Sequence, residues 1–68
     1  MMTSGQLRAA RALLGIDQKT LAGLADVSLP TIQRMESSDG VVRGTVETLT
    51  KVIEALHRAG VDLIGDNA

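Results

Sequence analysis

The chain of 68 residues contains no cysteine, no phenylalanine, tyrosine or tryptophan, and only one proline and one histidine. Without cysteine it can form neither a disulfide nor a thiolate metal site, and the lone His57 supplies too few ligands for zinc. Without aromatic rings the core must consist of smaller apolar residues. A domain of this size buries only roughly 60% of its unfolded surface. We therefore expect one domain over residues 1–68, stabilised further by dimerisation.

Long apolar runs are also missing. No stretch approaches the roughly 20 residues that span a membrane, and the N-terminus lacks the basic and apolar regions of a signal peptide. We expect a cytoplasmic protein that has no membrane partner. The sequence offers no nucleophile–base arrangement and no phosphate-binding glycine loop, so we expect no enzymatic activity and no cofactor.

The charge is low and unevenly distributed. The net charge of −1 argues against a nucleic-acid partner at first sight. However, residues 1–44 carry five basic and four acidic side chains, whereas residues 45–68 carry two basic and four acidic ones. The N-terminal part can present a weakly basic face, with modest affinity for DNA in a single copy. This balance again favours a dimer.

Apolar periodicity and capping residues predict four helices in an all-α fold. Gly15 and Gly60 are expected to end the first and the last helix in the left-handed conformation. The first predicted helix begins at Thr3 or Ser4 and ends at Leu14, with Ser4 as the candidate N-cap. The others, each with its N-cap, are residues 18–25 with Asp17, 29–36 with Ser28, and 46–59 with Thr45.

The last helix and the residues after it are expected to form the dimerisation element, residues 45–64. The predicted apolar face of this helix consists of Val46, Leu49, Val52, Ile53 and Leu56. Residues 61–64 are short, apolar and β-prone, so two copies of this segment can pair through main-chain hydrogen bonds. The side chains expected at the dimer interface are Leu56, Val61, Leu63 and Ile64.

The segment 17–36 is the most informative part of the chain. It predicts two short helices joined by a turn at residues 26–28, in which Asp26 tolerates the left-handed conformation. Ile32 and Met35 mark the inner side of the second helix. A short helix that rests on an apolar platform and keeps a free polar edge is suited to the major groove of DNA. A DNA-binding helix-turn-helix is therefore the favoured hypothesis.

Several residues inside and outside this segment occur at the spacing of a known helix-turn-helix pattern, which extends the hypothesis over roughly residues 4–60. They are Gln18, Leu21-Ala22, Val27-Ser28, Thr31-Ile32 and Glu36, with Arg11 upstream and Leu49 downstream. With these residues the chain resembles the helix-turn-helix domain of the lambda repressor and Cro superfamily, also called the xenobiotic-response-element type. It departs from that family by having Asp26 where glycine is usual and by having room for about four helices instead of five.

The resemblance implies that the third helix reads bases in the major groove. The expected base contacts are Leu29, Pro30, Gln33 and Arg34. Among them Arg34 is the best reader, because its guanidinium can bond guanine O6 and N7 together. Gln33 can read adenine or bond a phosphate oxygen. The competing interpretation of Arg34 is that it is a solvated surface charge that does not contact DNA.

The expected phosphate contacts surround this helix. The resemblance implies that Gln18 holds a phosphate at the start of the second helix, where the helix dipole adds to the attraction. Ser28 and Thr31 are expected to act first as capping or packing residues. The full set of candidate phosphate contacts is Gln18, Lys19, Ser28, Thr31, Ser37 and Arg43.

Arg11 and Glu36 are expected to have a structural role. Both lie on otherwise inward stripes, and the resemblance implies that they form a salt bridge between the first helix and the end of the third. Loss of one partner would leave the other charge buried without compensation.

These inferences predict a transcriptional regulator that binds double-stranded DNA as a homodimer at a pseudo-palindromic operator. RNA polymerase or another protein is a further candidate partner. The alternative is an antitoxin or adapter that uses the same fold to bind a protein, which the low net charge and the apolar Leu29-Pro30 pair favour.

Overall fold

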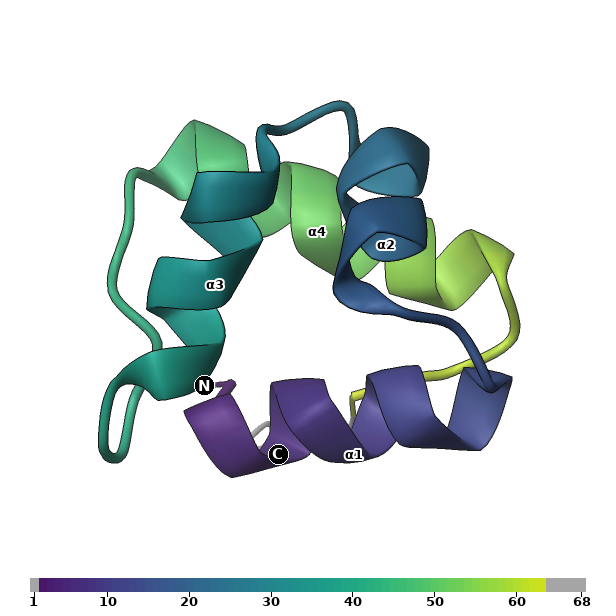
Figure 1. Ribbon diagram of the computed structural model, residues 1–68, viewed down its shortest axis with the longest axis horizontal. Coiled ribbons are helices and arrows are strands. Elements are labelled where there is room, and N and C mark those ends of the chain that lie inside the picture. The colour runs from purple at the N-terminus through teal and green to yellow at the C-terminus, as the bar shows by residue number, and fades with distance from the viewer. Residues whose placement is uncertain (1, 64–68) are drawn as a thin grey trace.

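The computed structural model describes residues 2–63, which form four helices and no strand. The helices are α1 (Ser4–Leu14), α2 (Gln18–Ala25), α3 (Leu29–Ser37) and α4 (Val46–Arg58). In Figure 1, α1 lies along one side of the molecule, α2 and α3 stand opposite it, and α4 passes behind them. The predicted all-α class is confirmed, and each helix begins and ends within one residue of its predicted bounds.

A side chain caps the start of every helix, which explains why the N-termini were predictable. Asp17, Ser28 and Thr45 each accept a hydrogen bond from a backbone N–H in the first turn of the following helix. The prediction for α1 was wrong by one residue. Its cap is Thr3, which accepts from the Gln6 N–H at 3.0 Å, while Gln6 Oε1 accepts from the Thr3 N–H at 2.8 Å. This reciprocal pair is a capping box.

Three helices end with the same backbone motif. Gly15, Asp26 and Gly60 adopt positive φ angles of 67°, 57° and 109° directly after α1, α2 and the cap of α4. The next residue in each case is apolar and half-buried against the core, and its N–H bonds a carbonyl five residues back. This is the Schellman arrangement, which satisfies the last carbonyls of a helix. The three apolar residues are Ile16, Val27 and Val61.

The end of α3 is built differently. Its C-cap, Ser38, is extended, so the chain leaves the helix without a left-handed residue. Side chains supply the missing donors: Ser4 Oγ donates to the Met35 carbonyl at 2.7 Å, and Arg8 donates to the Glu36 carbonyl. Both donors belong to α1. Helix α1 therefore caps the C-terminal end of α3 together with the local hydroxyls of Ser37 and Ser38, which donate to the Arg34 and Met35 carbonyls at 3.1 and 3.3 Å.

The core contains only aliphatic and methionine side chains. Its fully buried members include Leu7, Leu21, Ile32 and Leu56, which come one from each helix. The predicted apolar face of α4 needs correction, because Val46 and Ile53 are 80% and 41% exposed, respectively. Val52 and Leu56 are buried as predicted, and Leu49 is half-buried and packs against the core. Ala55 completes the buried stripe of α4.

The N-terminal residues and the loop between α3 and α4 hold each other. Thr3 and Val41 form a single antiparallel bridge, flanked by hydrogen bonds from the Ser4 N–H to the Gly40 carbonyl (2.8 Å) and from the Val42 N–H to the Met2 carbonyl (3.0 Å). Met2 and Val42 are both buried. This contact closes the loop over the core, and nothing in the sequence had indicated it.

The residues around the end of α4 correct one expectation about dimerisation. Residues 61–63 form no strand within the chain: the Val61 N–H donates to the Leu56 carbonyl at 2.9 Å, and Val61 and Leu63 pack against the core. Pairing of this segment between two copies stays a prediction. Leu56 is wholly buried, so it has no surface to offer a second copy. Ile64 lies outside the described residues. Among the residues described, no helix has both the length and the apolar character to cross a lipid bilayer.

Candidate nucleic-acid interface

Helices α2 and α3 pack against each other around the turn at residues 26–28. Asp26 takes the left-handed conformation (φ 57°, ψ 46°) in which glycine is usual. Aspartate is one of the residues that tolerate this region. Val27 then packs against the core, and Ser28 caps α3. The departure from glycine is therefore accommodated within an otherwise regular turn.

The outer side of α3 carries most of the predicted base-reading residues. Pro30, Gln33 and Arg34 are exposed, and Ser37 is exposed one turn further on. Leu29 needs a correction, because it is half-buried and packs against the core. It lies three residues before Ile32, on the same helical stripe, so its own spacing indicated an inward position.

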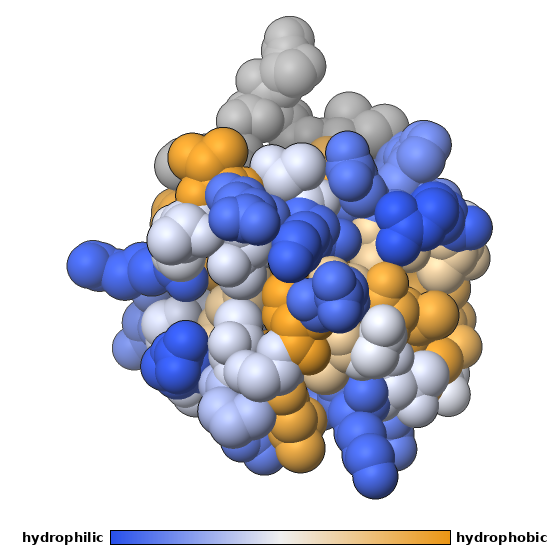
Figure 2. Space-filling model, turned by 90° about the horizontal axis from the view of Figure 1, so that it is seen from above, coloured by the Kyte–Doolittle hydropathy of each residue, from blue (hydrophilic) through white to orange (hydrophobic). Residues whose placement is uncertain are grey.

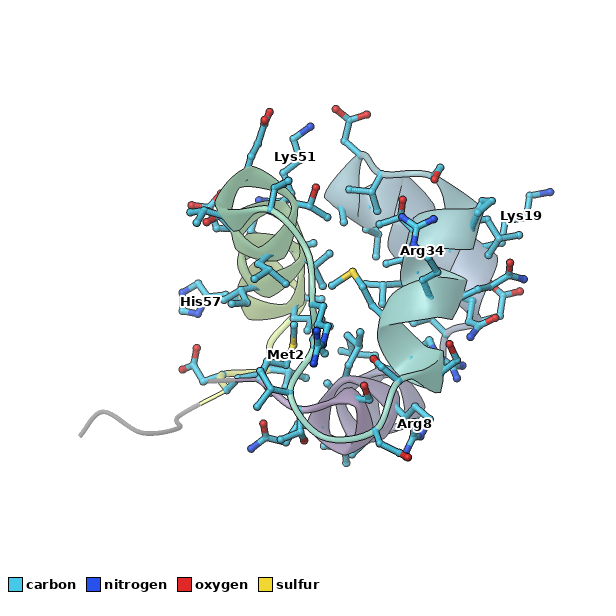
Figure 3. The ribbon with its side chains drawn as sticks, turned by 90° about the vertical axis from the view of Figure 1, so that its left-hand side faces the viewer. Met2, Arg8, Lys19, Arg34, Lys51 and His57 are labelled. Atoms are coloured by element: carbon cyan, nitrogen blue, oxygen red, sulfur yellow. The ribbon has the colours of Figure 1, made fainter. Side chains whose placement is uncertain are left out.

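The candidate phosphate contacts differ in whether their side chains already form hydrogen bonds within the protein. Lys19, Ser37 and Arg43 are exposed. Lys19 and Arg34 lie on the α2–α3 side of the molecule, whereas Lys51 and His57 lie on α4, on the other side (Figure 3). Ser28 Oγ accepts the Thr31 N–H at 3.3 Å and shares a hydrogen bond of 2.8 Å with the Thr31 hydroxyl. Capping is therefore the first role of this serine, as expected.

Arg11 and Glu36 form the centre of a polar network beneath the α2–α3 pair. Arg11 Nε and Nη2 donate to the two carboxylate oxygens of Glu36 at 2.8 and 3.0 Å, which is a bidentate pair. Arg11 Nη1 also donates to the Ile16 carbonyl at 3.1 Å. Gln18 Nε2 donates to Glu36 Oε1 at 3.1 Å. The Glu36 side chain is only 4% exposed, so the network neutralises a charge that water cannot reach.

The network determines the charge state of Glu36. Burial raises the pKa of this carboxyl, but the hydrogen bonds from Arg11 and Gln18 and the arginine charges outweigh burial and leave the pKa below its ordinary value. The hydrogen bond with Glu36 likewise raises the pKa of Arg11. The ion pair is therefore fully charged at neutral pH.

Sequence reasoning missed Ser4 and Arg8 as residues that hold α3. With Arg11 they form one face of α1, spaced at i, i+4 and i+7, and all three donate to the last turn of α3. The spacing was visible in the sequence, but the partner carbonyls were not. Helix α3 is therefore fixed in position by α1, at the end of the helix and away from its exposed edge.

A helix-turn-helix pair with an exposed polar edge on its second helix defines the class of DNA-binding helix-turn-helix domains. A helix-turn-helix family model matches residues 7–63, which is most of the chain. The protein belongs to this family, of the lambda repressor and Cro type, whose members are DNA-binding regulators. No curated protein and no solved structure matches the chain.

Proposed function

We propose that the protein is a sequence-specific transcriptional regulator that binds a pseudo-palindromic operator as a homodimer. One observation carries this proposal. The exposed edge of α3, with Gln33 and Arg34, stands free of the core while three side chains of α1 fix the end of that helix. Rigid support beneath an exposed polar edge is what base recognition in the major groove requires.

The division of labour follows from side-chain chemistry. Arg34 reads a guanine through its two parallel N–H donors, and Gln33 reads an adenine or bonds a phosphate. Gln18, Lys19 and Arg43 contact the phosphates on either side of the groove. Pro30 supplies an apolar contact for a thymine methyl group. Because these side chains include few positive charges, a second copy is needed for strong binding.

An exposed apolar stripe on α4 supports the homodimer. Val46 and Ile53 are seven residues apart and therefore lie on the same face of the helix. Both are exposed, although their size and apolar character favour burial. We place the dimer contact on this stripe and on the half-buried Val61 and Leu63, in place of the buried Leu56.

Selection of bound duplexes from a random DNA pool tests the proposed function. The expected result is one motif with two-fold symmetry, in which the half-sites are about one helical turn apart. Fluorescence anisotropy with the selected duplex and with a scrambled duplex then gives the specificity ratio. A pool that shows no enrichment would contradict sequence-specific binding, and an asymmetric motif would contradict the dimer.

Sedimentation velocity tests the contact on α4 separately. Val46→Glu places a charge on the proposed interface and should shift the protein to monomers. Leu13→Glu is the matched control, because Leu13 is 79% exposed but lies on α1. It should leave the distribution of species unchanged. Equal behaviour of the two variants would show that the dimer contact lies elsewhere.

A protein-binding module, such as an antitoxin or adapter, is the second candidate. Figure 2 shows apolar side chains interspersed with hydrophilic ones over the face seen from above, and Leu13 and Val46 are each about four-fifths exposed (79% and 80%). A titration with random-sequence duplex at low salt discriminates between the two functions. Absence of binding at micromolar protein concentration would favour the protein-binding module.

A further inference from the structure

Glu36 contacts side chains from two other helices at once. Its carboxylate accepts hydrogen bonds from Arg11 of α1 and from Gln18, the first residue of α2, while Glu36 itself belongs to α3. The side chain is 4% exposed and cannot reach a bound DNA duplex. Arg11 supplies the opposite charge. The hydrogen bond with Gln18 adds to the stabilisation of the carboxylate and also acts on Gln18 itself.

This hydrogen bond determines which way the Gln18 carboxamide faces. The orientation of a glutamine amide is normally assigned from its hydrogen bonds. An ionised carboxylate can only accept, so the amide must turn its nitrogen toward Glu36 Oε1, at 3.1 Å. One N–H of that nitrogen is engaged in this bond. The second N–H remains as a donor on a half-buried side chain at the first turn of α2.

We propose that Glu36 is a positioning residue for DNA binding, which holds the Gln18 carboxamide with its second N–H ready to donate to a phosphate oxygen. This inference rests on the proposed function. It gives Glu36 a role beyond its ion pair with Arg11, because the carboxylate ties the phosphate anchor on α2 to the reading helix α3. The separation between these two contacts is then fixed before DNA binds.

The expected gain comes from conformational entropy. A free glutamine side chain must be immobilised when it binds a phosphate, whereas a side chain that is already held loses less freedom. The usual cost of ordering one such side chain corresponds to a factor of about 2 to 12 in affinity. Loss of the Gln18–Glu36 hydrogen bond should weaken DNA binding by a factor in this range.

The first experiment needs no DNA. Side-chain amide groups of 15N-labelled protein are measured by NMR relaxation and by hydrogen exchange with solvent. Gln33 is the internal control, because it is an exposed glutamine on α3. The Gln18 amide should be more ordered and should exchange more slowly than that of Gln33. In Glu36→Gln the two glutamines should behave more alike. Equal mobility in the wild-type protein would overturn the proposal.

The second experiment is a double-mutant cycle for binding to the selected duplex. Its variants are Gln18→Met, Glu36→Gln and the double variant, all measured at a temperature where circular dichroism shows each to be folded. Glu36→Gln should weaken binding in the wild-type background and have little further effect beside Gln18→Met. Equal losses in both backgrounds would mean that Glu36 acts only through general stability, and would overturn the proposal.

Failure of the proposed function gives a different pattern. If the wild-type protein binds no duplex, the phosphate role is refuted together with the proposed function, even where the Gln18 amide is ordered. If the wild-type protein binds but the cycle shows no coupling, only the positioning role of Glu36 is refuted. If Glu36→Gln does not fold, the NMR relaxation of the wild-type protein and the DNA affinity of Gln18→Met test the proposal. The proposal requires that the Gln18 amide is ordered and that Gln18→Met binds DNA more weakly than wild type.

Discussion

Replacement of Arg11 by methionine should strongly destabilise the protein. Methionine replaces the aliphatic part of the arginine side chain but removes its three hydrogen bonds, two to Glu36 and one to the Ile16 carbonyl. Glu36, at 4% exposure, is then a buried charge whose main partner is gone. Breaking a well-buried pair costs about 3–5 kcal/mol. Because the Arg11 side chain is 24% exposed, solvent screens part of this effect, and we expect about 2–4 kcal/mol.

Thermal and urea denaturation followed by circular dichroism measure this change. For a domain of this size, a loss of 1 kcal/mol lowers Tm by roughly 4–8 °C, so Arg11→Met should lower Tm by about 8 °C or more. Arg11→Met combined with Glu36→Met is the control. Because it removes both charges, it should be more stable than Arg11→Met alone.

The pH dependence of the stability provides a second test of the ion pair. In the wild-type protein the pKa of Glu36 is lowered, so the stability it contributes is present above the unfolded-state pKa and is lost as pH falls through the folded-state pKa. In Arg11→Met, burial without the arginine should raise that pKa. The stability difference between the two proteins should therefore shrink on acidification. A Tm within 2 or 3 °C of wild type at neutral pH, or a difference that grows in acid, would refute the reasoning.

Three further predictions concern other parts of the molecule. Gly23→Ala should raise the free energy of unfolding by about 0.5–1 kcal/mol, because Gly23 lies in a helix and an added Cβ would meet nothing within 4 Å. Gly15→Ala should lower the free energy of unfolding by about 1 kcal/mol, because Gly15 has a φ of 67°. The same Tm shift for both variants would contradict the structure. Ser4→Ala should cost about 1–2 kcal/mol in urea denaturation through its lost bond to the Met35 carbonyl, and the exposed Ser37→Ala far less. Arg34→Ala should cost about 1–3 kcal/mol of DNA-binding free energy and relax the preference at one base position. Lys19→Ala should weaken binding to all DNA sequences alike. An unchanged motif in Arg34→Ala would mean that α3 is wrongly placed on the DNA.

The helix boundaries were predictable because local chemistry determines them. Asp17, Ser28 and Thr45 cap the helices that follow, through hydrogen bonds that span only three residues. Gly15 and Gly60 likewise end helices by adopting a backbone conformation that other residues disfavour. Such interactions form within one turn of the chain, so neighbouring residues suffice to indicate them.

The errors arose where a residue has two plausible roles. Ser4 is as good a cap as Thr3 by residue type, but only contact with α3 shows that its hydroxyl is used elsewhere. Val46 and Ile53 are apolar, yet the packing of α4 leaves them at the surface. In each case a distant part of the chain made the decision.

The sequence by itself determined the number and order of the helices, the turn at Asp26 and the family to which the chain belongs, because each depends on local caps or on spacing along one segment. Only the tertiary structure decided how α3 is held. The hydroxyls of Ser37 and Ser38 donate locally to carbonyls in the last turn of α3. The further donors at this end of the helix are Ser4 and Arg8, more than 25 residues earlier in the chain. The buried Glu36 carboxylate likewise takes its partners from two other helices. Spacing can place such residues on one face of a helix, but only the packing of α1 against α3 brings donor and acceptor together.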